Sequence, residues 1–365
     1  MINSMELTEY FGERAHSLLK SVMGSSLRDP RESAFLMRFG LSLRRAQRRR
    51  ESHEMDGLHV PMFLICSITS SCNLHCKGCY ARANGICGDV EGMELSDDEW
   101  DYVFQQASSL GIPFIILAGG EPMMRMEVLR RASEHHDIVF PAFTNGTMVS
   151  GNMDLFMDNR NLIPVLSLEG GRDATDRRRG DGAFDSVMDV MSSLGDRGIM
   201  YGASVTVTTE NQGEVLSDEF IDMLGSMGCR IVFLIEFVPS DRALVHLAPD
   251  EDMRVDCLRR VDELRRRHGM VIFSFPGDEA KLGGCLGAGR GFFHINPFGD
   301  AEACPASPYS DVNVRDGGLE GALRSDLFRE LRMNELLSGE HNGGCVLLER
   351  ESEVRRIVDG VFGAH

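Results

Sequence analysis

The sequence lacks the features that mark membrane proteins and nucleic-acid-binding proteins. Among its 365 residues, no apolar run approaches the roughly eighteen that a membrane-spanning helix needs. The first residues lack the basic and then apolar layout of a signal peptide. Lysine is scarce, with three residues, and the net charge is −18, whereas phosphate binding needs clustered positive charge. We therefore expect a cytoplasmic protein that neither spans a membrane nor binds nucleic acid.

Disulfide bonds are not expected in such a protein, although it contains ten cysteines. In a reducing compartment, this many cysteines indicate metal binding or catalysis. Cys66, Cys229 and Cys257 lie in or beside apolar runs and are interpreted as small core residues. The remaining cysteines are the candidates for chemistry: Cys72, Cys76, Cys79, Cys87, Cys285, Cys304 and Cys345.

The first 57 residues are predicted to be helical. Apolar residues recur at helical spacing over Glu6–Met23 and again from Arg31 to about Arg50, after Pro30. No alternating strand pattern occurs here, so the segment does not resemble the small winged module with which some peptide-modifying enzymes hold a leader peptide. We interpret residues 1–57 as a helical segment that caps the rest of the chain.

From Pro61 onward, short apolar segments alternate with amphipathic ones. The expected strands are Met62–Thr69, Pro113–Ala118, Ile138–Phe143, Ile163–Leu168, Gly202–Thr208 and Arg230–Val238. The expected helices between them are Ser96–Leu110, Met123–His136, Met153–Asn159, Ala183–Arg197 and Leu216–Met227. This alternation predicts an α/β fold with parallel strands and right-handed crossovers. Six such units over residues 58–245 form a partial TIM-like (β/α)6 barrel.

Two further segments come after the predicted barrel. Residues 246–281 are expected to be a connection that holds a helix at Pro249–His268 and a strand at Met270–Phe275. Residues 282–365 are expected to form a small C-terminal module. Within it, Phe292–Asn296 and Ala301–Ala303 flank a turn at 297–300 and predict a hairpin.

Each of the six predicted strands ends in a polar or glycine-rich segment. The segments are 70–80, with three cysteines, and then Gly119–Pro122, Thr144–Thr147, Ser167–Gly170, Thr208–Asn211 and Pro239–Asp241. Ligands of parallel α/β folds bind at the carboxyl ends of the strands, which lie at one rim. We therefore expect the functional site at this rim.

The cysteines of the first segment, Cys72, Cys76 and Cys79, have the spacing C-x₃-C-x₂-C. Three thiolates on one tight loop can hold three irons of a [4Fe–4S] cluster and leave the fourth iron open. The alternative is a structural zinc site, which needs a fourth ligand and commonly uses paired C-x₂-C units. No such pair lies nearby, and this favours the cluster.

With this loop, the chain resembles the radical S-adenosylmethionine (SAM) superfamily. The resemblance implies that the open iron binds the amino and carboxylate groups of SAM. One electron from the cluster, supplied by a ferredoxin or flavodoxin, would cleave SAM under anaerobic conditions. The resulting 5′-deoxyadenosyl radical would abstract a hydrogen atom from the substrate.

The resemblance also implies a set of SAM contacts. Gly119, Gly120, Glu121 and Pro122 match the GGEP loop that meets the methionine amino group. Glu169 stands where the superfamily more often has aspartate, and Arg179 is expected at the methionine carboxylate, whereas Arg177 and Arg178 are expected to face solvent. The remaining expected contacts, for the ribose, methionine or adenine moieties, are Tyr80, Thr144, Asn145, Ser167, Thr206, Thr208 and Asn211. Thr144 and Asn145 are also typical of a simple turn.

The C-terminal module resembles the opening of the SPASM/Twitch modules, which bind auxiliary clusters. Cys285 and Cys304 have its C-x₁₃-G-x₄-C spacing, and Cys345 adds a third thiolate. A full SPASM module has further cysteines, so we expect one auxiliary [4Fe–4S] cluster. Its fourth ligand is then a non-cysteine group, Cys87 or substrate. The alternative is that the three cysteines are unrelated core residues.

Cys87 is a further candidate, as a hydrogen-atom donor. A thiol near the rim is able to return a hydrogen atom to a substrate radical, but a loop cysteine without a role is the favoured interpretation. No acid–base pair is nominated, because the radical forms on the cofactor.

Three functions remain open from the sequence. The first is radical modification of a peptide or protein side chain, since SPASM/Twitch modules often accompany such substrates. The second is modification of a small molecule, such as decarboxylation of a tetrapyrrole precursor. The third is a non-catalytic iron–sulfur protein, against which the SAM motifs count. A wide barrel mouth would favour the first, and a closed basic pocket the second.

Overall fold

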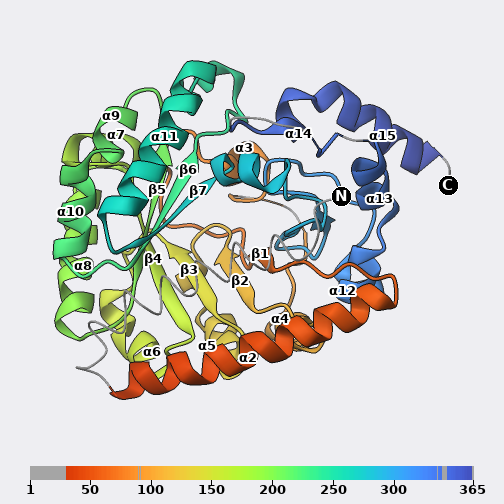
Figure 1. Cartoon of the computed structure of the whole chain (residues 1–365), viewed down its shortest axis with the longest axis horizontal. Helices are drawn as coiled ribbons and strands as arrows, with labels where there is room; N and C mark the ends of the chain where they lie inside the picture. Colours follow the sequence, from red (N-terminus) through yellow and green to blue (C-terminus); the bar gives the residue numbers. More distant parts are fainter. Residues whose placement is uncertain (1–29, 89, 91, 335, 339–342, 364–365) are drawn as a thin grey trace.

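The structure is a computed structural model that describes residues 30–88, 90, 92–334, 336–338 and 343–363. Nine strands of the described chain form one curled sheet in the order β7-β6-β5-β4-β3-β2-β1-β8-β9 (Figure 1). They are β1 Phe63–Ser67, β2 Phe114–Ala118, β3 Phe140–Thr144, β4 Leu162–Leu168, β5 Gly202–Val207, β6 Ile231–Glu236, β7 Val271–Phe275, β8 His294–Ile295 and β9 Ala301–Glu302. The predicted partial α/β barrel is confirmed.

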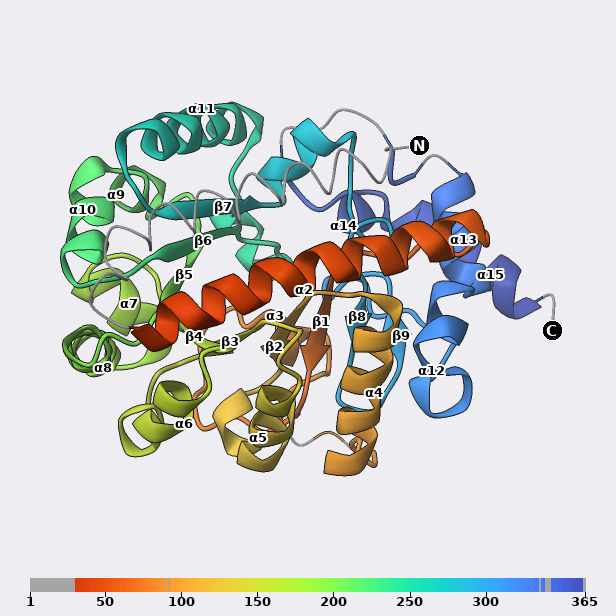
Figure 2. The ribbon, with the colours of Figure 1, turned by 60° about the horizontal axis from the view of Figure 1, so that its bottom comes forward.

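The helices that connect the strands cover the outer face of the sheet (Figures 1 and 2). They are α4 Asp97–Leu110, α5 Met126–Glu134, α6 Met153–Asp158, α8 Ala183–Asp196, α10 Asp218–Ser226 and α11 Glu251–Arg267. Ser96 and Glu99 form a capping box at the start of α4, which satisfies backbone N–H groups that the first helical turn leaves unpaired. Apolar side chains of these helices and of the strands form one continuous core, in which Trp100 and Tyr201 are fully buried.

Short elements occupy the carboxyl ends of the strands. They are α3 Tyr80–Ala83 after β1, the 3₁₀ turn η1 Pro122–Met124 after β2, η2 Ser150–Asn152 after β3, α7 Arg172–Arg179 after β4, α9 Gln212–Val215 after β5 and η3 Arg242–Leu247 after β6. Helix α7 was not expected from the sequence. Its one buried residue is Thr175, so the apolar periodicity that usually marks a helix is missing.

Helix α2, Pro30–Met55, crosses the end of the barrel opposite to the cysteine loop (Figure 2). Leu36 and Phe39 pack against Val139, Ile163 and Met200, which lie at the amino-terminal ends of β3, β4 and β5. The apolar face of α2 therefore closes the bottom of the barrel. The helix expected at Glu6–Met23 lies outside the described residues.

The sheet extends beyond six barrel strands at both edges. Strand β7, from the expected connection 246–281, pairs in parallel with β6 from Ile231↔Val271 to Ile235↔Phe275. At the other edge, β8 pairs in parallel with β1, and β9 pairs antiparallel with β8. The C-terminal hairpin thereby continues the barrel sheet, while the division of the chain at 57, 245 and 281 stays a prediction.

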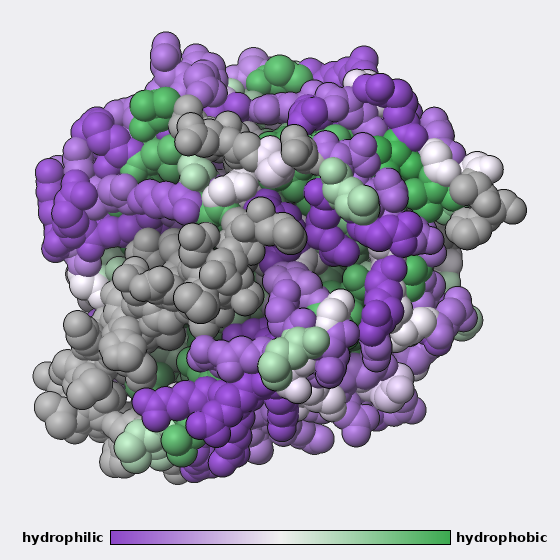
Figure 3. Space-filling view, turned by 45° about the vertical axis from the view of Figure 1, so that its right-hand side comes forward, coloured by the Kyte–Doolittle hydropathy of each residue, from purple (hydrophilic) through white to green (hydrophobic). Residues whose placement is uncertain are grey.

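The C-terminal helices lie beside this hairpin (Figure 1). They are α12 Val314–Leu323, α13 Asp326–Met333, α14 Val346–Glu349 and α15 Glu351–Gly363. On the face that Figure 3 shows, the described surface is mostly hydrophilic, and apolar residues appear only in small groups. In the described part of the chain, no helix combines the length and the apolar character that crossing a membrane requires.

Candidate functional site

The three-cysteine loop begins directly after β1 and ends at α3. Cys72, Cys76 and Cys79 are half-buried and line the barrel lumen, a cavity of about 460 Å³. Cys79 is the residue that precedes α3, and Tyr80 is the first residue of that helix. The loop therefore holds its three thiols at the mouth of the lumen, as its position after the first strand predicted.

Cationic side chains surround these thiols. The pKa of Cys72 is lowered to about 6, chiefly by a hydrogen bond with Cys87, and Arg82 and His75 act in the same direction. Burial raises the pKa of Cys76, whereas the charges of Arg179 and Arg178 oppose that rise. Positive charge at this loop favours thiolates, the form in which cysteine binds metal.

The two glycines of the GGEP loop touch the cysteine loop itself. A Cβ atom on Gly120 would lie 2.0 Å from the Ser71 carbonyl oxygen, and one on Gly119 would lie 2.5 Å from the Thr69 oxygen. The amide of Gly120 donates to the Thr69 oxygen at 2.8 Å, and that of Glu121 donates to the Ser71 oxygen at 2.8 Å. Glycine is required here because the backbones of two strand ends meet at hydrogen-bonding distance.

Glu121 joins the ends of β2 and β3. The carboxylate is buried and accepts hydrogen bonds from the Thr144 hydroxyl at 2.7 Å and from the Asn145 amide at 2.8 Å. Burial raises the pKa of Glu121. The Asn145 side chain donates in turn to the Asn73 side chain in the cysteine loop, at 2.8 Å. Thr144 and Asn145 thus connect the third strand to the cysteine loop.

Glu169 pairs with two arginines of α7. Its carboxylate lies 2.6 Å from a nitrogen of Arg178 and 2.6 Å from one of Arg179. Arg178 also donates to the Lys77 carbonyl at 3.0 Å, so its side chain is mostly buried against the cysteine loop. The expectation that Arg178 faces solvent was wrong, because Glu169 offers it a buried partner. Arg177 is exposed, as expected, and pairs with Glu210.

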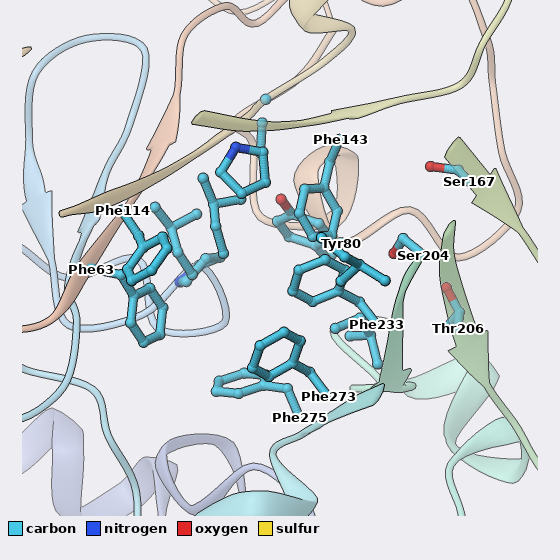
Figure 4. A pocket seen from close by; sticks show the side chains of 18 of the residues that line it. Phe63, Tyr80, Phe114, Phe143, Ser167, Ser204, Thr206, Phe233, Phe273 and Phe275 are labelled. Atoms are coloured by element: carbon cyan, nitrogen blue, oxygen red, sulfur yellow. The ribbon is translucent and has the colours of Figure 1, made fainter. Parts of the chain in front are cut away.

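The residues expected near the ribose separate into two groups. Ser167 and Thr206 line the lumen, and Ser204, which sequence reasoning missed, lies opposite Ser167 on the neighbouring strand (Figure 4). Thr208 and Asn211 are buried outside the lumen lining. The Asn211 side chain donates to the main-chain carbonyl oxygen of Glu169 at 2.8 Å and to that of Thr206 at 2.7 Å. It therefore links the end of β4 to β5.

The C-terminal cysteines lie close to one another and are more deeply buried. Cys285 and Cys304 are buried and Cys345 is partly buried. Burial raises the pKa of all three thiols, and that of Cys345 reaches about 12. Cys304 and Cys345 add electrostatically to the rise at Cys285, so the three thiols are neighbours although they are distant in sequence.

Two connections fix this second group against the barrel. The fully buried His294 bonds to the Ser67 hydroxyl of β1 at 2.8 Å and to the Glu302 carboxylate of β9 at 2.7 Å. The amide of Gly344, next to Cys345, donates to the Glu236 carboxylate at the end of β6, at 3.0 Å. The C-terminal module is therefore attached to both the first and the sixth strand.

The second cysteine group reaches the same lumen through Cys304. Cys304 lines it together with the three cysteines of the loop. Burial raises the pKa of Tyr80, and the charges of Cys79 and Cys304 add to that effect, so Tyr80 lies near cysteines of both groups. Its hydroxyl bonds with Ser67. The barrel mouth thus brings thiols of both groups to one cavity.

One known family matches the part of the chain that carries this geometry. The model of the Radical SAM superfamily matches residues 66–224, which include the cysteine loop and the next four strands. The chain contains a radical SAM domain over these residues. It is an enzyme of the kind that uses a [4Fe–4S] cluster and SAM.

Individual relatives cover most of the chain. The mycofactocin maturase MftC of Mycolicibacterium smegmatis is 27% identical over 300 residues, which cover 76% of this chain and 74% of MftC. The AdoMet-dependent heme synthase of Methanosarcina barkeri is 25% identical over 310 residues, covering 77% of this chain and 88% of the synthase. The structure of Streptococcus suis SuiB bound to its precursor peptide SuiA has a TM-score of 0.63 at 16% identity, covering 84% of this chain and 77% of SuiB.

The residues present fit the cofactors of a radical SAM enzyme. In the described residues, no three histidine, cysteine or acidic side chains converge closely enough to hold a single metal ion. The three loop thiols, with cationic side chains around them, have the donor chemistry that a [4Fe–4S] cluster needs. The hydroxyls of Ser167, Ser204 and Thr206 stand across the lumen from the loop, where a polar nucleoside has hydrogen-bond partners.

Sequence reasoning missed the aromatic character of the lumen. Nine phenylalanine side chains line it. Six of them are labelled in Figure 4, namely Phe63, Phe114, Phe143, Phe233, Phe273 and Phe275, and the other three are Phe35, Phe39 and Phe237. The Phe233 ring lies 5.0 Å from the ring of Phe143 and 5.1 Å from that of Phe273, centroid to centroid. Since β3 and β6 are not neighbours in the sheet, this row of rings crosses the lumen. The inward-facing alternate positions of each strand were the available signal.

Proposed function

We propose that this radical SAM enzyme modifies an apolar or aromatic side chain of a peptide or protein. The observation that carries the proposal is the shared lumen, which is lined by the loop cysteines, by Cys304 of the second group and by phenylalanine rings. We assign Cys72, Cys76 and Cys79 to the SAM-binding cluster, and Cys285, Cys304 and Cys345 to an auxiliary [4Fe–4S] cluster of the SPASM/Twitch kind. When bound, the first cluster supplies the electron that cleaves SAM and so provides the radical that abstracts hydrogen.

The residues of this chain bind and orient the reactants. We assign SAM contacts to the rim residues that line the lumen: Tyr80, Gly119, Gly120, Glu121, Asn145, Ser167, Arg179 and Thr206. Glu169 holds Arg179 at the rim, and Thr144 and Asn211 hold the strand ends that carry the contacts. Helix α2 closes the bottom of the lumen and excludes water from the reacting hydrogen atom.

The lining of the lumen supports an apolar substrate group. Phenylalanine, isoleucine and valine side chains form most of the wall below the rim, and such a wall gains free energy by burying apolar surface. The maturase MftC and the peptide-bound SuiB support a peptide as the molecule that carries this group. The substrate would then insert one side chain while its backbone stays at the mouth.

A tetrapyrrole precursor is the second candidate, favoured by the similarity to AdoMet-dependent heme synthases. Tetrapyrrole precursors carry several carboxylates, which need basic partners. The arginines that line the lumen already have partners within the chain: Arg82 donates to the Leu74 oxygen, and Arg178 and Arg179 pair with Glu169. The lumen is therefore less suited to a polyanion than to an apolar side chain.

We also infer the remaining partners from the chemistry. A ferredoxin or flavodoxin delivers the electron, because cleavage of SAM needs a low-potential donor. The net charge of −18 disfavours nucleic acid as substrate. The oxygen sensitivity of exposed clusters fits a reducing cytoplasm.

Anaerobic turnover tests the proposal. Reconstituted protein is incubated with dithionite, SAM and either a peptide library with aromatic and aliphatic residues or a set of coproporphyrin derivatives. Mass spectrometry then detects 5′-deoxyadenosine and the change in substrate mass. A peptide that loses two hydrogen atoms or carbon dioxide supports the proposal. Turnover of the porphyrins alone would support the second candidate, and failure to form 5′-deoxyadenosine with any substrate would contradict both.

A further inference from the structure

The auxiliary site contains one side chain besides its three cysteines that has the chemistry of an iron ligand. Glu279 lies on η4, Gly277–Leu282, which comes after β7, and its side chain is buried, with 2% of the residue exposed. Its carboxylate hydrogen-bonds with the Cys285 thiol. Its charge also acts on Cys304 and Cys345.

The backbone fixes the orientation of this carboxylate. The amide of Leu286, one residue past Cys285, donates to Oε1 of Glu279 at 2.8 Å. The amide of Gly284, one residue before Cys285, donates to the Glu279 carbonyl at 3.1 Å. The turn that presents Cys285 is therefore folded around Glu279. Glu279 and Cys304 both line the lumen.

The other nearby groups are engaged elsewhere. Cys87 bonds with Cys72 and packs with Cys79 and Tyr80, so it belongs to the first cysteine group. The Asp278 carboxylate pairs with Arg265 at 2.6 Å. The Glu302 carboxylate is held by His294 at 2.7 Å and by Asn296 at 2.9 Å. Glu279, by contrast, hydrogen-bonds with Cys285 and acts electrostatically on both Cys304 and Cys345.

We propose that the Glu279 carboxylate is the fourth protein ligand of the auxiliary cluster. This inference rests on the proposed function, which places a [4Fe–4S] cluster on the three cysteines. A carboxylate completes the coordination of the iron that the thiolates leave open. The fourth iron would then be closed to substrate.

The test isolates the auxiliary cluster and asks whether its fourth iron is open. The parent is the full chain with Cys72, Cys76 and Cys79 changed to alanine, reconstituted anaerobically and reduced. Electron paramagnetic resonance is recorded before and after addition of ¹³C-cyanide, a small ligand that binds an open iron. We expect no ¹³C hyperfine coupling in the parent and clear coupling in the Glu279→Ala variant.

Two further variants complete the design. Glu279→Cys replaces the carboxylate by a thiolate, so we expect about four irons, a shifted g tensor and no cyanide coupling. Glu302→Gln is the matched control, because Glu302 is equally buried and stands two residues from Cys304. We expect the spectrum of this control to equal that of the parent. If Glu279→Ala does not fold, the g tensor of Glu279→Cys alone tests whether residue 279 binds the fourth iron.

The outcomes separate this inference from the proposed function. A parent without iron would contradict the auxiliary cluster itself. A parent that binds about four irons but shows cyanide coupling equal to that of Glu279→Ala would overturn only the role of Glu279. An unshifted g tensor in Glu279→Cys would overturn it as well.

Discussion

The two cysteine groups differ in exposure and in the charges around them. The loop cysteines are half-buried and have Arg82, His75, Arg178 and Arg179 as electrostatic neighbours. Cys285 and Cys304 are buried, and burial and neighbouring negative charges raise the pKa of both thiols. Because the loop cysteines and Cys304 line one lumen, the contrast indicates different tasks. The loop is built to admit a ligand, and the second group is built to enclose its cluster.

The largest expected effect concerns the loop. Cys76→Ala removes a thiolate from the SAM-binding cluster, so formation of 5′-deoxyadenosine falls to background. Chromatography of the reaction products measures it. Cys229→Ala is the control, because Cys229 is a buried core residue whose change should leave the rate nearly intact. Normal cleavage of SAM by Cys76→Ala would contradict the assignment of SAM cleavage to the loop cysteines.

The second prediction concerns the enclosed group. Cys304→Ala should reduce iron from about eight to about four per chain, since one [4Fe–4S] cluster is lost. SAM cleavage should persist while product formation stops, because the loop cysteines are untouched. Iron analysis and mass spectrometry measure the two quantities. Loss of both activities together, in a folded protein, would show that the groups do not act separately.

A third prediction tests the ion pairs of Glu169 with Arg178 and Arg179. Glu169→Gln leaves the buried ends of Arg178 and Arg179 without their carboxylate, which should lower the free energy of unfolding by about 3 kcal/mol and weaken SAM binding. Thermal unfolding and isothermal titration with SAM measure the two effects. Glu210→Gln is the matched control, since Glu210 forms an exposed pair with Arg177, and its change should cost less than about 1 kcal/mol.

The fourth and smallest effect concerns the close contact between Gly120 and the cysteine loop. Gly120→Ala places a Cβ atom 2.0 Å from the Ser71 oxygen, so the cysteine loop must shift. We expect a loss of about 2 kcal/mol in stability and weaker binding of the first cluster, with the auxiliary cluster retained. Gly151→Ala provides the comparison, because no atom lies within 4 Å of the added group. Equal behaviour of the two variants would contradict the close contact.

The fold was largely predictable from the sequence, and the site only in part. The strands and most helices could be predicted from apolar periodicity, and the cysteine loop and GGEP loop from their spacing. Pairing of β8 with β1 joins a two-residue strand to a partner far away in sequence, so no local pattern reveals it. Periodicity also fails at α7, where the pairing of Arg178 with Glu169 depends on the tertiary structure.

The same limit applies to Glu279 and to the phenylalanine lumen. Glu279 stands in an ordinary polar turn in the sequence, and only the fold brings it to three cysteines. The phenylalanines occupy strands whose apolar residues face either the lumen or the helices, and a sequence does not say which side is hollow. Local sequence patterns identified the cysteine loop and the GGEP loop. The side chains that surround them depend on long-range packing.

The presence of two clusters at one lumen is tested most directly by spectroscopy on one pair of samples. Mössbauer spectra and iron analysis are recorded for the reconstituted wild-type chain and for the chain with Cys72, Cys76 and Cys79 changed to alanine. We expect about eight irons in the first and about four in the second, all in [4Fe–4S] clusters. A wild-type value near four, with none left in the triple variant, would contradict the second cluster.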